Sequence, residues 1–135
     1  GAKIPIELRQ CVGDNVNLRG HIPFEQLSEV MADMDIAIVP SLYGAGMQQK
    51  IFEPLARGFP AIISARGLAG YSFQPGVHLL SADTAAEFVD CLSQLRDREL
   101  RERLSGAVKE RALELFSMEA IEGVLLPELK RVLNN

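Results

Sequence analysis

The sequence contains no tryptophan and only two cysteines and two histidines. Cys11 and Cys91 lie far apart in apolar helical contexts, so we expect two buried free thiols rather than a disulfide. Free thiols are typical of a reducing compartment, which favours a cytoplasmic location. Neither the cysteines nor His21 and His78 have neighbours at metal-ligand spacing, so we expect no zinc site.

Long hydrophobic runs and clusters of basic residues are also absent from the sequence. No stretch reaches the roughly 18 to 20 uninterrupted apolar residues that span a bilayer. The 14 lysines and arginines are outnumbered by 18 acidic residues, and they mostly alternate with acids near the C-terminus. A nucleic-acid partner held by general electrostatics is therefore not expected.

The composition that remains is that of one globular domain covering residues 1–135. Hydrophobic residues make up 47% of the chain, and short apolar runs alternate with segments of helical periodicity. We expect helices at 3–13, from 24 and at 47–57, and strands at 16–22, 36–39, 61–64 and 77–80. This alternation predicts βαβ units, and hence an α/β fold with a Rossmann-like parallel sheet flanked by helices.

The C-terminal part, about residues 84–133, is predicted to be helical throughout. Thr84 and Glu87 have the spacing of a capping box, which opens the first of three helices at about 84–96, 97–116 and 118–133. The charged face of the second helix is typical of a solvated surface with offset ion pairs.

The most informative stretch runs from residue 33 to residue 60. A buried strand at 36–39 is followed by a loop containing Gly44 and Gly46, and then by a helical pattern that stops at Gly58. Amides of such a loop and of a helix start point at one spot, where the helix dipole adds positive potential. The order of strand, glycine loop and helix therefore predicts an anion site.

A series of short motifs carries a resemblance to a known family. The motifs are Asn15 to Ile22, Ala32-Asp33, Asp35 to Ser41, Gly44-Ala-Gly46 to Glu53, Ala56 to Pro60, and Phe116-Ser117. Over about residues 11–133 the sequence resembles the C-terminal, donor-binding domain of GT-B glycosyltransferases, and most closely the group one retaining enzymes. The resemblance implies a nucleoside diphosphate sugar as donor, transfer to an acceptor hydroxyl, and no metal or other cofactor.

The resemblance also implies roles for residues of the glycine loop and of the helix after it. Glu53 is expected to accept hydrogen bonds from ribose hydroxyls, and the amides around Gly46, Met47 and Gln48 to receive the diphosphate or the sugar. Lys50 precedes Glu53 by three positions, so we expect it on the same helical face, where it can neutralise phosphate. The nucleotide-sugar site is predicted to consist of Gly44, Ala45, Gly46, Met47, Gln48, Lys50 and Glu53.

Two positions of this site depart from the family pattern. Many members have a second glutamate where this chain has Ala45, whereas a subset resembles Gly-x-Gly-x-x-x-Lys-x-x-Glu, which Gly44, Gly46, Lys50 and Glu53 match. Pro54 stands where the family usually has alanine. A proline inside a helix has no N–H to offer the carbonyl of Lys50, so we expect a kink beside Glu53.

The resemblance further implies that the chain is the later part of one domain of a two-domain enzyme. Family members have an N-terminal acceptor-binding domain and a basic pair that holds the diphosphate, and no such segment precedes Lys3. We therefore expect the chain to be inactive alone. We also expect self-association through an exposed sheet edge. Peripheral membrane association of the parent enzyme stays open.

Plainer interpretations remain open beside these. Glu53 can pair with Lys50 or Arg57 on a solvated helix face, and Gly44 and Gly46 can be simple turn residues. Gly67 and Gly70 either contact the donor sugar or belong to a flexible loop. The whole chain can be a non-catalytic α/β binding domain, such as a degenerate transferase, or a nucleotide-sugar epimerase of related fold.

Overall fold

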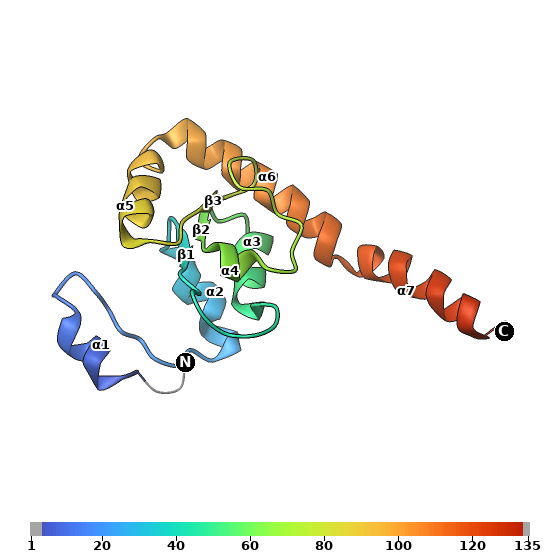
Figure 1. The fold of residues 1–135 in the computed structure, drawn as a ribbon, viewed down its shortest axis with the longest axis horizontal. Coiled ribbons are helices and arrows are strands. Elements are labelled where there is room, and N and C mark those ends of the chain that lie inside the picture. The colour runs from blue at the N-terminus through green and yellow to red at the C-terminus, as the bar shows by residue number, and fades with distance from the viewer. Residues whose placement is uncertain (1–3, 134–135) are drawn as a thin grey trace. The chain divides into compact units, whose positions relative to one another are not determined.

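A computed structural model describes residues 4–133 of the chain (Figure 1). These residues form two compact units that meet in sequence between Met34 and Asp35. The second unit contains the sheet and the predicted site, and each unit is described by itself.

The first unit contains two helices, α1 (Ile6–Cys11) and α2 (Phe24–Ala32). The strand predicted at 16–22 is wrong, because none of those residues is extended in a ladder. Gly20 has a φ of +72°, a left-handed conformation that interrupts an extended strand. The predicted burial of Cys11 is also wrong, since its side chain is exposed at the end of α1.

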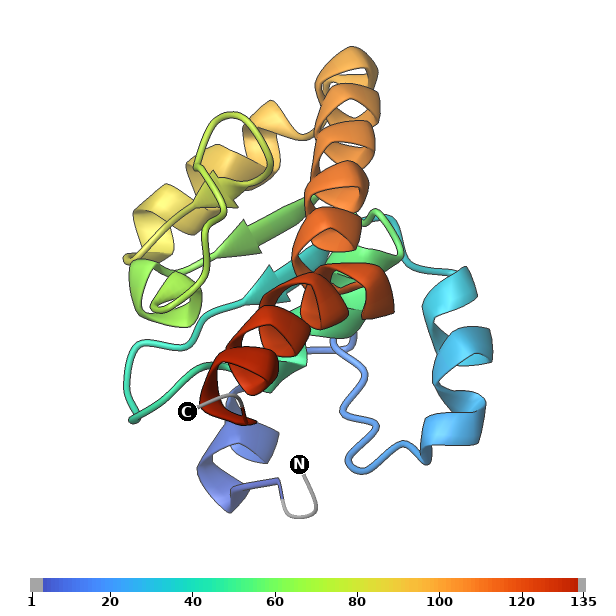
Figure 2. The same ribbon diagram turned by 90° about the vertical axis from the view of Figure 1, so that its right-hand side faces the viewer.

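The second unit is built on a parallel sheet of three strands, β1 (Ala37–Val39), β2 (Ala61–Ile63) and β3 (Leu80–Ser81). The strands lie in the order β1-β2-β3 (Figure 2). Ile62 pairs with Ile38 on one side and with Leu80 on the other. The predicted α/β fold with a Rossmann-like parallel sheet is therefore confirmed.

Alternating side chains of β2 send apolar groups to both faces of the sheet, as the twofold period of a strand requires. Ala61 and Ile63 pack on one face with residues that precede and follow β2 in the sequence, including Leu55 and Val108. Ile62 packs on the opposite face with Leu80, Ala82, Cys91, Leu95 and Leu104. The central strand is completely buried, which fixes the positions of the loops that follow the strands.

Three helices make up the C-terminal part, namely α5 (Ala85–Gln94), α6 (Arg98–Phe116) and α7 (Met118–Leu133). The predicted capping box is confirmed, because the Thr84 hydroxyl accepts from the Glu87 amide while the Glu87 carboxylate accepts from the Thr84 amide. α5 packs against β2 and β3, and α7 continues beyond the end of α6 (Figure 1).

The third strand begins later than the sequence predicts. Val77 and His78 lie in a turn, in which both of their amides donate to the carbonyl of Gln74. Gly76 has a φ of +80°, which turns the chain before β3 can start.

Among residues 4–133, no helix combines the length and hydropathy that crossing a bilayer requires.

Candidate functional site

The carboxyl ends of β1, β2 and β3 lie at one edge of the parallel sheet. Ser41 follows β1, Ser64 follows β2 and Asp83 follows β3. Ser64 and Asp83 tie these ends together, because the Ser64 hydroxyl donates to the Ser41 carbonyl at 2.8 Å and Asp83 Oδ1 accepts from the Ala65 amide at 2.9 Å. In open α/β sheets, ligands bind outside this edge.

The helical segment after the glycine loop starts later than predicted and is divided. A single 3-10 turn, η1 (Gln49–Ile51), precedes the short helix α3 (Phe52–Ala56). Pro54 explains the division, because without an N–H it leaves the carbonyl of Lys50 with no α-helical partner. Pro54 therefore falls in the first turn of α3, where amides need no helical partner, and not inside a longer helix.

The predicted end of this helix at Gly58 is confirmed. Gly58 has a φ of +79°, and its amide donates to the carbonyl of Leu55 while the Phe59 amide donates to that of Pro54. This pair of bonds defines a Schellman motif, which needs a left-handed residue at the Gly58 position. A Cβ at Gly58 would also lie 3.3 Å from the carbonyl oxygen of Ser105 in α6.

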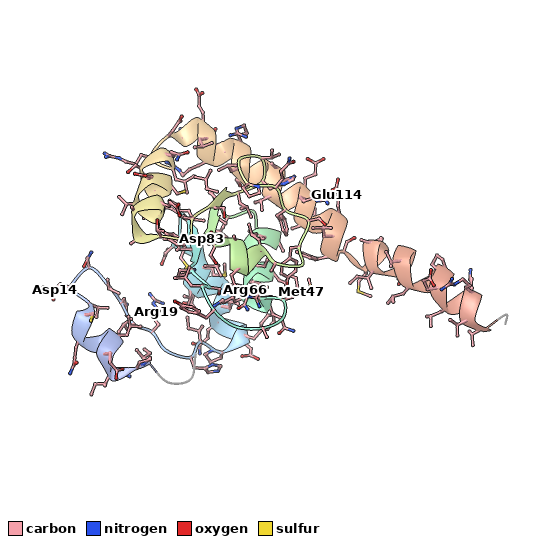
Figure 3. The ribbon with its side chains drawn as sticks, viewed as in Figure 1. Asp14, Arg19, Met47, Arg66, Asp83 and Glu114 are labelled. Atoms are coloured by element: carbon pink, nitrogen blue, oxygen red, sulfur yellow. The ribbon has the colours of Figure 1, made fainter. Side chains whose placement is uncertain are left out.

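Residues 44–47, called here the glycine loop, are exposed and carry two left-handed glycines. Gly44 has a φ of +114° and Gly46 a φ of +76°. Arg66 donates to the carbonyl of Gly44 through Nε at 2.7 Å and also through Nη2, and Nη2 reaches the carbonyl of Gly46 at 3.0 Å. Figure 3 labels Arg66 and Met47, the last residue of the loop. One guanidinium therefore holds both glycine carbonyls.

This arrangement determines where two amides of the glycine loop point. In a trans peptide the carbonyl and the following N–H point in opposite directions. The N–H groups of Ala45 and Met47 are therefore directed away from Arg66, and neither donates a hydrogen bond to any residue between 4 and 133. Unpaired amides on one side of a glycine loop form a concavity suited to an anion.

Arg66 belongs to α4 (Ala65–Leu68), a short helix that the sequence prediction missed. The Ser64 hydroxyl accepts from the amide of Gly67 and so caps this helix. Gly67 is buried, and a Cβ there would lie only 2.7 Å from Cγ2 of Ile63, so its role is close packing of α4 on β2. The serine cap was the available sequence signal, whereas nothing in the sequence links Arg66 to the glycine loop.

Gly70 supports the other end of the glycine loop. A Cβ at Gly70 would lie 2.9 Å from Cγ of Met47, so the Met47 side chain rests directly on the Gly70 backbone. Gln48, the next residue, is half-buried, and its Oε1 accepts from the hydroxyl of Ser41 at 3.4 Å. The segment after β2 thus contacts the glycine loop at both Arg66 and Gly70.

Glu53 forms the ion pair that the plainer interpretation predicts. Its Oε1 accepts from both Nε and Nη2 of Arg57 at 2.6 Å, one helical turn away on α3. Its Oε2 has no hydrogen-bond partner among the described residues. Lys50 is exposed on η1 and forms no ion pair within the same part of the chain. Within residues 4–133, Glu53 therefore has one carboxylate oxygen without a hydrogen-bond partner.

Aromatic side chains from α6 and from the loop after α4 pack against Phe52 of α3. The ring of Phe52 meets Phe116 edge-on at 4.6 Å and Tyr71 at 5.5 Å. The Tyr71 hydroxyl has no partner among residues 4–133, and burial raises its pKa. This cluster fixes the helix that carries Glu53 by local packing.

Comparison with known proteins places the chain in a class. Residues 5–121 match the glycosyl transferase-like family, which is nearly the whole chain. The chain therefore belongs to this glycosyltransferase family, in agreement with its α/β sheet and with the loops at the carboxyl edge of that sheet.

A particular relative is the MMP alpha-(1->4)-mannosyltransferase of Mycolicibacterium hassiacum. It is 30% identical to the chain over 115 residues, which cover 82% of this chain and 28% of the relative. The chain thus spans less than a third of the length of this relative. No solved structure matches the chain.

Proposed function

We propose that the chain is the donor-binding part of a two-domain GT-B glycosyltransferase of the group one, retaining type. The parent enzyme would transfer a sugar from a nucleoside diphosphate sugar to an acceptor hydroxyl. The observation that carries this proposal is that the amides of Ala45 and Met47 have no hydrogen-bond partner among residues 4–133, in a glycine loop at the carboxyl edge of a parallel sheet. Membership of a glycosyltransferase family supports the choice of donor.

The diphosphate of the donor fits the glycine loop. Gly44 and Gly46 have no side chains, so a phosphate can approach the backbone closely, and the amides of Ala45 and Met47 can donate to its oxygens. Lys50 is exposed one turn further along the chain and would neutralise part of the negative charge. Gln48 is held by Ser41 and would orient the start of η1.

The ribose of the donor fits Glu53. Arg57 donates to Oε1, so that Oε2 can accept a hydrogen bond from a ribose hydroxyl. The ion pair with Arg57 is compatible with this role, because it restricts the rotation of the carboxylate. Ala45, where many family members have a glutamate, supplies only its backbone.

The chemical role of this part is stabilisation of the leaving group. In a retaining transfer, the acceptor hydroxyl attacks the donor on the face from which the nucleoside diphosphate departs. Negative charge grows on the diphosphate as the bond to the sugar breaks, and amides of the glycine loop together with Lys50 would stabilise that charge. We assign no general base to the chain.

The acceptor side of the reaction is proposed to lie in a separate domain. The chain covers only 28% of the mannosyltransferase relative. Transfer requires acceptor and donor to be brought together, so we propose that the chain alone binds the donor without transferring its sugar.

Titration with nucleoside diphosphates tests the proposal. Amide NMR shifts followed during addition of UDP, GDP and ADP should change at residues 44–53 for at least one of them. Glu53→Gln should weaken that binding by about 1.5 to 3 kcal/mol, the contribution of a charged hydrogen bond.

Glu102→Gln is the matched control. Glu102 pairs with Arg98 one helical turn away at 2.7 Å, on the exposed surface of α6. Its replacement should leave nucleotide affinity unchanged. A lack of shifts for all three nucleotides at millimolar concentration would favour a non-catalytic binding domain, and equal effects of the two variants would remove Glu53 from the site.

A further inference from the structure

Arg66 is the side chain that connects the segment after β2 with the glycine loop. Its Nε and Nη2 both donate to the Gly44 carbonyl, and Nη2 also donates to the Gly46 carbonyl at 3.0 Å. The two carbonyls are separated by Ala45 and belong to glycines with positive φ. A planar guanidinium can engage two carbonyls at once, whereas a lysine ammonium is a single point charge.

The glycine loop has few other attachments. Ala45 and Met47 donate no backbone hydrogen bonds within residues 4–133, and a Cβ on Gly46 would meet nothing within 4 Å. Glycines lose more conformational freedom on ordering than other residues, so an unsupported loop of this composition would sample many conformations. Only some of those conformations direct the amides of Ala45 and Met47 to the same side.

We infer that Arg66 is the positioning residue of the glycine loop, and that it orders the amides of Ala45 and Met47 for a diphosphate. This inference rests on the proposed function for the identity of the anion. Arg66 acts by holding the carbonyls of Gly44 and Gly46, which turns the following amides in the opposite direction. The loop is thereby ordered before the ligand arrives, which lowers the entropic cost of binding.

Two variants separate this role from simple charge attraction. Arg66→Gln removes the positive charge and the contacts with both carbonyls. Arg66→Lys keeps the positive charge but removes the planar guanidinium that contacts both carbonyls at once. Both should weaken binding of the nucleoside diphosphate that the wild-type chain binds, Arg66→Gln by at least about tenfold. Wild-type affinity in Arg66→Lys would show that charge alone matters and would overturn the inference.

Arg103→Gln provides the matched control. Nη1 of Arg103 donates at 3.3 Å to the carbonyl of Gly76, which is also a glycine with positive φ but belongs to the turn before β3. This variant removes one exposed arginine and one contact to a glycine carbonyl, and it should bind nucleotide as the wild type does. A loss equal to that of Arg66→Gln would overturn the inference.

A measurement without ligand distinguishes failure of this inference from failure of the proposed function. NMR order parameters of the amides of residues 44–47 should fall to roughly 0.6 or below in Arg66→Gln and stay at about 0.85 in Arg103→Gln. If no nucleotide binds the wild-type chain, the proposed function fails. A fall in the order parameters would then still support the positioning role, and unchanged order parameters would overturn it.

Discussion

The hydroxyl of Ser64 donates a hydrogen bond of 2.8 Å to the carbonyl oxygen of Ser41, and Ser64 is completely buried. The two serines follow adjacent strands, so this bond joins the carboxyl ends of β1 and β2. The same hydroxyl accepts from the Gly67 amide at 3.1 Å and caps α4, the helix that carries Arg66. The Ser64 side chain therefore links the ends of β1 and β2 to α4, whose Arg66 holds the glycine loop.

Replacement of Ser64 should destabilise the fold measurably. Ser64→Ala leaves the buried Ser41 carbonyl and the Gly67 amide without a side-chain partner, so we expect a loss of about 1 to 3 kcal/mol in the free energy of unfolding. Urea denaturation followed by circular dichroism measures this loss. Ser93→Ala is the control, because the Ser93 hydroxyl donates to the Val89 carbonyl on the exposed face of α5. Equal stability of the Ser64 and Ser93 variants would contradict the linking role.

Replacement of Gly46 by alanine should weaken binding of a nucleoside diphosphate, whereas the same replacement of Gly76 should not. Both glycines have a left-handed φ, +76° and +80°, and a Cβ on either would meet nothing within 4 Å. Alanine at each position therefore brings a similar backbone strain of about 1 to 2 kcal/mol without a clash. Only Gly46→Ala should also weaken binding of a nucleoside diphosphate, measured by calorimetry. Equal affinities of the two variants would place the anion site elsewhere.

Local patterns of the sequence were sufficient to predict two of the three strands of the sheet, β1 and β2, whereas β3 begins later than predicted. The apolar runs before Pro40 and Ser64 form β1 and β2, and Gly58 ends α3, because each of these features depends on neighbouring residues. The alternating pattern at 16–22 predicted a strand that does not form. Alternation alone cannot show that Gly20 takes a left-handed conformation, which breaks the extended chain.

The candidate site was predictable only in part. Glycines followed by Lys50 and Glu53 indicate an anion loop and a helix, but Arg66 could not be predicted to hold the loop. It reaches backbone carbonyls of residues far away in sequence, and every residue has such a carbonyl, so no pattern marks the contact. The ion pair between Glu53 and Arg57 follows from helical spacing and was foreseen as one alternative.

The capping box of α5 should make the stability of the second unit depend on pH. Hydrogen bonds from the amides of Asp83 and Thr84 hold the pKa of Glu87 below its usual value. The folded state thus favours the carboxylate, and the stabilisation is complete above the unfolded pKa of about 4.3 and is lost as the pH falls through the lower folded pKa. Urea unfolding between pH 7 and pH 3 should show a smaller acid loss in Glu87→Gln than in the wild type.

Glu110→Gln is the control for this measurement, since Glu110 is exposed on α6 and its carboxylate has no hydrogen bond within the described residues. It should retain the acid dependence of the wild type. An unchanged pH profile in Glu87→Gln would contradict the contribution of the capping box.

The two cysteines should differ strongly in reactivity. Cys11 is exposed, whereas Cys91 is buried between α5 and the sheet. Burial, and then the charges of Asp90 and Glu87, raise the pKa of the Cys91 thiol, so little reactive thiolate is present near neutral pH. Maleimide labelling followed by mass spectrometry should modify Cys11 in the folded chain and Cys91 only in urea. Native labelling that persists in Cys11→Ser would contradict this difference.

Self-association should occur through β1. Within residues 4–133 this strand pairs with β2 alone, so its other edge has free N–H and carbonyl groups, and the central Ile38 is 46% exposed. An edge of this kind can pair with a second copy, and lysine on an edge strand prevents such pairing. Sedimentation velocity over a range of concentrations should show association of the wild type and less association of Ile38→Lys. Val89→Lys, on the exposed face of α5, should associate as the wild type does, and a wild-type chain that stays monomeric at every concentration would refute the prediction.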